Sequence, residues 1–330
     1  MHIPDNFLDP KTALITASLA ATGLGVALRH ARKHLPPRKV PLLGLSAAFV
    51  FAAQMLNFPV LGGTSGHLIG AVLVAVLLGP SAAVIVLSAV LIVQCLLFAD
   101  GGITALGANI FNMALIGGAG GWAVYALLLR IIPGRMNRTL AITIAAWSST
   151  VLASIACAGE LASSGLLDWS VAFPAMTSIH ALIGVGEALI TTLVINAIAQ
   201  TRPDLTTSKH GMAFLGQTVV PRENLLPLLV FGLLISLGLA LFVAPFACPW
   251  PDGLDKTAQT LGFAHRASQF PHAPFADYQV PGVTSGGGGI ATAIAGAAGT
   301  LILFGLLHLA ARALFARRPP TRTDSPADAA

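Results

Sequence analysis

Long runs of apolar residues, separated by short polar stretches, make up most of the chain. A run of about 17–25 apolar residues is long enough for a helix to cross a bilayer. The pattern therefore predicts an all-α fold, a polytopic membrane helical bundle with about nine spans. The spans are predicted at residues 12–28, 40–58, 67–80, 82–99, 109–131, 139–159, 172–199, 225–247 and 288–311.

The third predicted span is short, and the residues before it are rich in glycine. Residues 59–70 include Gly62, Gly63, Gly66 and Gly70, and they predict a loop that dips into the protein before a helix begins. Irregular backbone survives at membrane depth only where protein or a polar cavity surrounds it. We therefore expect neighbouring helices to enclose this loop.

The composition of the chain excludes a water-soluble protein. Of its 330 residues, 55% are hydrophobic and only 9% are charged, whereas a soluble domain carries about 25% charged residues. The net charge of +5 does not indicate nucleic-acid binding, because no basic stretch is interleaved with aromatic residues. The partner that this composition predicts is the lipid bilayer.

The basic residues are distributed unevenly between the two sides of the predicted bundle. Of the 18 Lys and Arg residues, all but Lys11, Lys256 and Arg266 lie in the loops after the first, fifth, seventh and ninth spans. Cytoplasmic loops are enriched in Lys and Arg, so we expect the N-terminus outside and the C-terminus inside. Residues 1–10 lack the basic and apolar regions of a signal peptide, and we expect Met1 to be the mature terminus.

Changes in composition along the chain divide it into four parts. Residues 1–200 are predicted to form a body of about seven spans, and the charged stretch 201–224 a cytoplasmic linker. Residues 225–317 are predicted to form a two-span accessory segment, whose outer loop, 248–286, is rich in Pro, Gly and His. The polar tail, 318–330, is expected to be disordered.

Motifs of common enzyme classes are absent from the sequence. There is no Gly-x-x-x-x-Gly-Lys-Ser/Thr for nucleotide binding, no Gly-x-Ser-x-Gly elbow, and none of the three glutamates follows a histidine. We therefore expect a protein that is not an enzyme and does not hydrolyse ATP itself. The three cysteines are too few and too far apart for a metal cluster, and we expect them to pack as apolar groups. They are Cys95, Cys157 and Cys248.

The first two residues, Met1 and His2, can chelate a metal ion. A free terminal amine, the His2 backbone nitrogen and the His2 imidazole close two fused rings and leave one position of a square open. The backbone nitrogen binds well only after it loses its proton, which Ni²⁺ and Cu²⁺ can drive. Square-planar nitrogen coordination is also the preference of these ions. A frayed terminus without function is the alternative that these two residues leave open.

His67 strengthens the hypothesis of a metal site. It ends the dipping loop, on the same predicted outer side as the terminus, and Thr64 and Ser65 beside it supply hydroxyl groups. An imidazole inside an apolar body is a functional hypothesis by default. A structural histidine that is satisfied by hydrogen bonds is the alternative.

Several further polar side chains are predicted at the outer ends of the spans, where they could hydrogen-bond to ligating imidazoles. Ligating histidines usually donate their second N–H to an oxygen. The alternative, equally weighted for each residue, is hydrogen bonding between helices. The candidates are Gln54, Asn57, Thr64, Ser65, Asn109, Asn112 and His180.

Glu187 is the one acidic residue that lies deep in a predicted span. It follows His180 by two helical turns, so both side chains are expected on one face. A carboxylate in hydrocarbon is costly, by about 2.5–3.5 kcal/mol, so it must be paired, protonated or facing another subunit. We favour a structural or coupling role over metal ligation.

Four motifs of the body resemble one known family. They are Met1–Asp5 (MHIPD), Gly63–His67 (GTSGH), Asn109–Met113 (NIFNM) and His180–Glu187 (HALIGVGE). Together they resemble the CbiM/NikM substrate-binding components of energy-coupling-factor importers for cobalt and nickel, over about residues 1–200. The accessory segment, with Pro251–Asp255 (PDGLD), resembles the NikN/CbiN (PDGLE-type) component, here fused to the body.

The resemblance implies a specific site and specific partners. It implies that Met1 gives its amine, His2 its backbone nitrogen and imidazole, and His67 its imidazole, in a square of four nitrogens. It also implies a multi-pass protein of the bacterial inner membrane, with a separate transmembrane coupling subunit and cytoplasmic ATPase subunits. Asn6 stands where many members of the family have glycine, which could alter the turn after the chelate.

The expected function is capture of Ni²⁺ for an ATP-driven importer, with no prosthetic group. Co²⁺ is the alternative substrate. An independent secondary metal transporter is a less favoured alternative, because the sequence has no clear inverted repeat, and an intramembrane metalloenzyme is the least favoured. Metal loading is expected to weaken as the pH falls, since every nitrogen ligand must lose its proton to bind.

Overall fold

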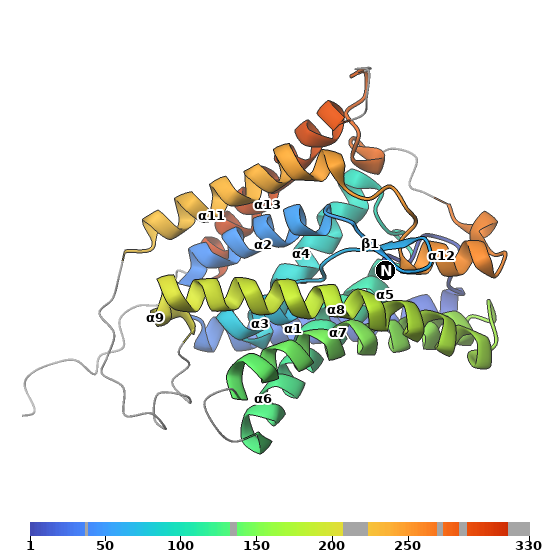
Figure 1. Cartoon of the computed structure of the whole chain (residues 1–330), viewed down its shortest axis with the longest axis horizontal. Helices are drawn as coiled ribbons and strands as arrows, with labels where there is room; N and C mark the ends of the chain where they lie inside the picture. Colours follow the sequence, from blue (N-terminus) through green and yellow to red (C-terminus); the bar gives the residue numbers. More distant parts are fainter. Residues whose placement is uncertain (37–38, 133–136, 207–223, 269–272, 284–288, 316–330) are drawn as a thin grey trace, which may run out of the picture.

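The computed structural model describes residues 1–330 except for 37–38, 133–136, 207–223, 269–272, 284–288 and 316–330. The described residues form a bundle of helices with one small β-hairpin (Figure 1). Seven of the described helical segments are long and apolar enough to cross a membrane. They are α1 (Pro10–His34), α4 (Pro80–Phe98), the continuous α5 (Leu106–Asn109), η2 (Ile110–Gly120) and α6 (Gly121–Ile131), α7 (Asn137–Ser163), α8 (Trp169–Thr201), the continuous α11 (Leu226–Gly238), η3 (Leu239–Val243) and η4 (Ala244–Phe246), and α13 (Gly289–Phe315).

Two of the nine predicted spans are shorter in the structure. The span predicted at 40–58 is α2 (Val40–Gln54), because the chain leaves the helix and forms a strand at residue 58. The span predicted at 67–80 is α3 (Ala71–Leu78), which Gly70 and Gly79 bound with φ values of 74° and 97°. Eight residues of helix rise about 12 Å, which is too short to cross a bilayer. The other seven predicted spans each overlap one of the seven long segments.

Local signals in the sequence explain where the helices begin and end. The Asp9 carboxylate accepts hydrogen bonds of 3.1 Å from the backbone N–H groups of Lys11 and Thr12, so it caps α1, and Pro10 occupies its first turn. The helix ends at His34 and Leu35 is extended, as a residue before proline prefers.

The glycine-rich loop contains a hairpin. Strand β1 (Phe58–Val60) pairs antiparallel with β2 (Thr64–Gly66). Gly62 and Gly63 form the turn with φ values of 86° and 69°, which glycine adopts without strain. The turn is exposed, whereas residues 64–70 are buried. The prediction of a loop enclosed by the protein is therefore confirmed for its second half.

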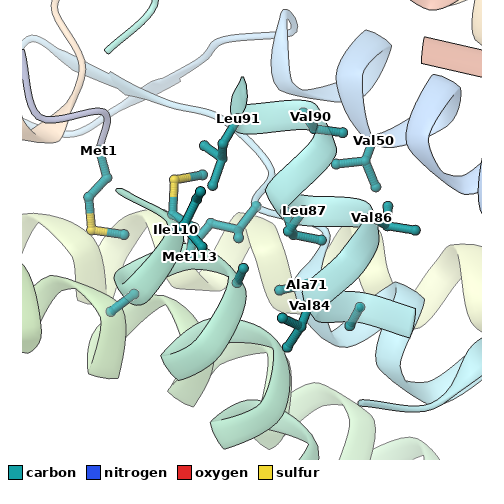
Figure 2. Close-up of a cluster of buried hydrophobic side chains, with 14 of the residues drawn as sticks. Met1, Val50, Ala71, Val84, Val86, Leu87, Val90, Leu91, Ile110 and Met113 are labelled. Carbon is teal, nitrogen blue, oxygen red and sulfur yellow. The ribbon is translucent and has the colours of Figure 1, made fainter. Parts of the chain in front are cut away.

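Helix α4 lies at the centre of the body. Of its most apolar window, 72% is buried, and its valines and leucines meet residues of α5 and η2 in a continuous apolar cluster (Figure 2). Met1, which is 3% exposed, belongs to this same cluster. Because lipid is as apolar as these side chains, close packing rather than exclusion of water holds such a cluster together in a membrane.

The accessory helices α11 and α13 pack beside α2 (Figure 1). Gly44 of α2 permits this approach, since a Cβ atom there would lie 2.7 Å from the carbonyl oxygen of Phe304. Between the two helices the chain returns over the end of the bundle that carries the hairpin. This stretch is the predicted outer loop, 248–286, and is called the outer segment below. It contains α12 (Gly253–Thr260) and the short turns η5 (Ala264–Arg266) and η6 (Ala276–Tyr278).

The described residues are thus mostly helical, as predicted, and the chain is a helical multi-pass membrane protein. The side of the membrane on which each terminus lies stays a prediction. Most of the predicted linker and all of the tail at 318–330 lie outside the described residues. Glu187 is not the only acidic residue buried within a long helix. Helix α7 continues to Ser163, beyond the predicted end at 159, so it includes the buried Glu160.

Candidate metal centre

The first residues of the chain fold back into the end of the bundle, between β1, α12 and α5 (Figure 1). Ile3 is completely buried, and Asn109 holds its backbone from both sides. The Asn109 Oδ1 atom accepts a 2.8 Å hydrogen bond from the Ile3 N–H, and its Nδ2 donates a 3.1 Å bond to the Ile3 carbonyl. The Gly102 N–H also donates to that carbonyl, at 2.9 Å. These bonds fix the backbone two residues after the terminal amine.

The turn after Ile3 depends on Asn6. This residue has a φ of 70°, a left-handed conformation that asparagine tolerates better than most residues apart from glycine. Its Nδ2 atom donates a 2.9 Å bond to the Ser268 hydroxyl, and the Ser268 N–H donates to the Asp5 carbonyl. Asparagine at this position therefore preserves the turn and adds a contact to the outer segment.

His67 lies beside the terminal amine and the His2 ring. Its Nδ1–H donates a 3.2 Å hydrogen bond to the Leu68 carbonyl, which leaves the lone pair on Nε2. The Met1 amine lies 3.3 Å from that Nε2 atom, and the His2 and His67 rings stack with their centroids 5.3 Å apart. The structure thus brings together the three residues that the sequence predicts as metal ligands.

Asp252, from the accessory segment, contacts the same amine. Its Oδ2 atom lies 2.5 Å from the Met1 nitrogen, while Oδ1 accepts a 2.9 Å bond from the Asp255 N–H and caps α12. This contact was not predicted from the sequence. An available signal was the order Pro251-Asp252-Gly253, which is typical of a helix cap, in a loop on the same predicted side as the terminus.

A second carboxylate, Asp100, contacts His2. Its Oδ1 atom lies 3.1 Å from the Nδ1 atom of His2, and its Oδ2 accepts a 2.6 Å bond from the Tyr278 hydroxyl. The other ring nitrogen of His2, Nε2, is buried without a hydrogen-bond partner among the described residues. Asp100 and Tyr278 were also missed, because only packing brings residues 2, 100 and 278 together.

These charges shift the proton affinities at the site. Burial alone would lower the pKa of the Met1 amine, but the Asp252 carboxylate outweighs burial and raises the pKa above its ordinary value. The same ion pair outweighs burial at Asp252 and holds its pKa well below the usual range.

Burial, followed by the Met1 ammonium group, lowers the pKa of His67 to about 3. Burial also lowers the pKa of His2, against the opposing charge of Asp100. Both imidazoles are therefore neutral and able to bind metal at physiological pH.

Two predicted imidazole partners, Thr64 and Ser65, contact the accessory segment instead. Thr64 Oγ1 donates a 3.0 Å bond to the Pro251 carbonyl, and Ser65 Oγ donates a 2.7 Å bond to the Trp250 carbonyl. The backbone N–H of Ser65 donates to the Pro251 carbonyl as well, at 2.8 Å. These hydrogen bonds join strand β2 to Trp250 and Pro251, the two residues that precede Asp252.

Gln54 supports the buried loop that carries His67. It donates a 3.0 Å bond to the Ile69 carbonyl and accepts one of 2.8 Å from Gln94. The backbone carbonyl of Asn57 accepts a 2.8 Å hydrogen bond from the Cys248 N–H. In the described part of the chain, no contact joins the Asn57 side chain to the imidazoles. Asn109 holds Ile3, as described above.

Asn112 and His180 have different surroundings. Asn112 Nδ2 donates a 2.6 Å bond to Glu160, so Asn112 and Asn109 do not share a partner. His180 donates from Nδ1 to the Met176 carbonyl, at 2.8 Å, and its Nε2 is buried without a described partner. It lines a cavity of about 10 Å³, the room of one water molecule, together with Met1, His67 and Asp252.

Among the residues that the structure describes, side chains alone do not form a metal site. Within the described ranges, no group of three or more His, Cys, Asp or Glu residues is arranged to hold a metal ion. The three cysteines are unpaired, and Cys95 and Cys157 are buried, as apolar packing predicts. The candidate centre is complete only if the amine and the backbone nitrogen at the terminus take part.

Comparison with known proteins identifies the family. The profile described as "CbiM: Cobalt uptake substrate-specific transmembrane region" matches residues 2–205, more than half of the chain. The chain belongs to the CbiM family. A second profile, the PDGLE domain, matches residues 226–316. This member of the CbiM family is therefore a CbiM/NikM-type protein fused to a NikN-type segment.

Fused relatives match the chain over nearly its whole length. A protein of Archaeoglobus fulgidus that carries the name of a fused nickel transport protein, NikMN, is 36% identical over 308 residues, which are 93% of this chain and 96% of that protein. The cobalt transport protein CbiM of Thermosediminibacter oceani is 31% identical over 207 residues, 60% of this chain and 84% of its own. This chain thus belongs to a family of nickel and cobalt transport proteins.

A solved structure supports the fold of the body. The crystal structure of a truncated transition metal transporter is similar with a TM-score of 0.56 and 37% sequence identity. The match covers 61% of this chain and 99% of that chain. The CbiM-type body therefore shares its fold with a transition metal transporter.

Proposed function

We propose that the chain is the substrate-capturing membrane subunit of an ATP-driven importer of the energy-coupling-factor type, and that its substrate is Ni²⁺. The metal is held by the Met1 amine, the His2 backbone nitrogen and imidazole, and the His67 imidazole. The observation that carries the proposal is the 3.3 Å separation between the Met1 nitrogen and His67 Nε2, with the His2 ring stacked on that of His67.

This separation fits two neighbouring corners of a square. With metal–nitrogen bonds of about 2 Å, such corners lie about 2.8 Å apart. The chelate rings dictate which atom of His2 takes part, since only Nδ1 closes a six-membered ring with the backbone nitrogen. Metal loading therefore requires Nδ1 to leave Asp100. The imidazole proton then lies on Nε2, which is buried and has no described partner in the present state. Once the ring has turned, this Nε2–H can donate to an oxygen acceptor such as the Asp100 carboxylate.

The charges around the nitrogens suit a divalent cation. A buried charge needs compensation, and Asp252 and Asp100 both lie within hydrogen-bond distance of proposed ligands. Loss of the His2 amide proton supplies a further negative charge. Square-planar nitrogen coordination with an ionised amide favours Ni²⁺. Co²⁺ is the second candidate, supported by the similarity to a cobalt transport protein.

The missing nucleotide-binding motif supports separate energy-coupling partners. Cytoplasmic ATPase subunits hydrolyse ATP, and a transmembrane coupling subunit joins them to this chain in the bacterial inner membrane. The terminus and the outer segment face outside, where they meet the incoming metal. In this arrangement residues 1–200 carry the metal site, residues 201–224 form the cytoplasmic linker, and residues 225–317 form the accessory segment.

Nickel binding by the purified chain tests the site. The expected result is one Ni²⁺ per chain with the absorption of a square-planar, diamagnetic ion, and the loss of that absorption in His67→Ala. Asn57→Ala is the matched control, because the Asn57 side chain lies at the same end of the bundle without a described contact to the imidazoles. Equal nickel binding in His67→Ala and the control would contradict the site.

Uptake measurements test the partners. Nickel uptake in a cell that lacks its own importer is expected only when the coupling and ATPase subunits are present with this chain. Uptake driven by the chain alone, without ATPase subunits, would favour an independent secondary transporter instead.

A further inference from the structure

Glu187 is completely buried within α8, yet it contacts none of the proposed nitrogen ligands. Its two oxygen atoms accept hydrogen bonds from backbone N–H groups of the loop that follows His67. Oε2 accepts from Ile69 at 2.5 Å and Oε1 from Gly70 at 3.0 Å. Both oxygen atoms of this costly intramembrane carboxylate are therefore bound to backbone N–H groups within three residues of His67 along the chain.

The loop needs these bonds because it has no regular structure of its own. Residues 67–70 are buried and lie between strand β2 and helix α3. Gly70 caps α3 in a left-handed conformation, with a φ of 74° and no side-chain cap. Buried backbone N–H groups need an acceptor. The Glu187 carboxylate supplies it for two consecutive residues, while Gln54 binds the Ile69 carbonyl between them.

Helix α8 also contacts the residue before His67. A Cβ atom on Gly66 would lie 2.6 Å from Cγ2 of Ile183, one turn before Glu187. The same helix therefore contacts the chain on both sides of His67, by packing at Gly66 and by hydrogen bonds at Ile69 and Gly70. Since α8 is 33 residues long, it is a rigid support for an otherwise irregular segment.

We propose that Glu187 is the positioning residue that sets the place of His67 Nε2 relative to the Met1 amine. This inference rests on the proposed metal site, in which His67 gives the fourth nitrogen. The carboxylate acts through the backbone of Ile69 and Gly70 and does not touch the metal. Its two hydrogen bonds hold the loop at the depth at which the imidazole meets the terminus.

Glu187→Gln tests the proposal with a side chain of the same size. Its amide nitrogen cannot accept a hydrogen bond, so one of the two backbone N–H groups loses its partner. The expected result is a loss of Ni²⁺ affinity of about ten- to hundredfold, the usual effect of removing an outer-shell partner. The square-planar absorption is expected to weaken together with the affinity.

The matched control is Glu160→Gln, because Glu160 is also a buried carboxylate but accepts its hydrogen bond from Asn112, at 2.6 Å. The control is expected to bind nickel like the unchanged chain.

A double-mutant cycle shows whether Glu187 acts through His67. In a His67→Ala background, Glu187→Gln is expected to cause no further loss of affinity, because the residue that it positions is gone. A further loss of tenfold or more in that background would overturn the proposal, and so would unchanged affinity in the single variant. If Glu187→Gln does not yield folded protein, Glu187→Asp replaces it in both backgrounds. Aspartate keeps the charge but is one methylene too short to hold both N–H groups.

The same measurements separate this inference from the proposed function. If the unchanged chain binds no nickel, or if His67→Ala binds it normally, the metal site itself is contradicted. If the unchanged chain binds nickel through His67 and Glu187→Gln does so equally well, only the positioning role is contradicted.

Discussion

The body and the accessory segment are built differently, although both consist of long apolar helices. In the body, 72% of the most apolar window of α4 is buried by neighbouring helices, whereas only 11% is buried in the stretch Leu226–Phe246 of the accessory segment. The body has its own core, while the first accessory helix leaves most of its apolar surface to lipid or to another subunit.

In contrast to the first accessory helix, the outer segment between the accessory helices packs closely on the body. Phe263 packs edge-on against Phe7 at 5.1 Å, and Tyr278 stacks on Phe98 at 4.9 Å. Asp252 contacts the Met1 amine directly. The body and the accessory segment are therefore not structurally independent. The body supplies the nitrogen atoms of the proposed site, and the accessory segment supplies a carboxylate and a cover for the terminus.

The largest effect is expected from the body. His2→Ala removes one imidazole from the proposed square, and Ni²⁺ affinity should fall by well over the roughly hundredfold that the loss of an outer-shell partner costs. Isothermal titration of the purified chain measures this effect. Asn57→Ala, measured alongside, should stay within about twofold of the unchanged chain, so a similar fall in both variants would mean that the loss is not specific to the site.

The pH dependence of binding should be steep. Metal binds the amine only after it is deprotonated, and the Asp252 carboxylate raises the amine pKa above its ordinary value. The His2 amide releases a second proton, whereas His67, with a pKa of about 3, is already neutral above pH 5. Affinity should therefore rise by about two decades per pH unit between pH 6 and 8, in proportion to the two protons released. Equal Ni²⁺ affinity at pH 5 and pH 8 would contradict the release of protons on binding.

The accessory carboxylate should have an intermediate effect. Asp252→Asn is expected to weaken Ni²⁺ binding about tenfold at high pH, because a charge that compensates the cation is lost. The same change lowers the amine pKa, so the pH at which the affinity levels off should move downward. A titration over pH 6–10 measures both effects. If neither the affinity nor the levelling pH changes, the accessory segment has no part in the site.

The smallest effect is expected from Tyr278→Phe. This variant removes only the hydroxyl that donates a 2.6 Å hydrogen bond to Asp100, and it keeps the ring that stacks on Phe98. Ni²⁺ affinity should fall a few-fold, because a single outer hydrogen bond contributes about 0.5–1.5 kcal/mol. No loss of affinity would show that the ring, and not the bond to Asp100, is what the site requires, and a loss as large as that of His2→Ala would contradict this minor role of the hydroxyl.

The sequence predicts the long helices well, since each is a continuous apolar run, and α1, α4 and α11 also have a proline in their first turn. It overestimates 40–58 and 67–80, because apolar content does not reveal that β1 and β2 interrupt the run or that Gly70 and Gly79 end the helix between them. Length alone therefore fails where the backbone turns inside the membrane.

The candidate site is predicted in part for a similar reason. Met1 and His2 are neighbours in the chain, so their chelating capacity is visible in the sequence. Asp100 and Asp252 reach the site only through packing, from 98 and 251 residues away along the chain. No spacing in the sequence encodes such contacts.

In the proposed site, the terminal amine shares one metal ion with the His67 imidazole from the buried loop after strand β2. X-ray absorption of the nickel-loaded chain, compared with a chain whose terminus is extended by several residues, tests it most directly. We expect four short nitrogen ligands and a square-planar edge in the unextended chain, and loss of both on extension. Six-coordinate nickel, or an unchanged spectrum after extension, would contradict it.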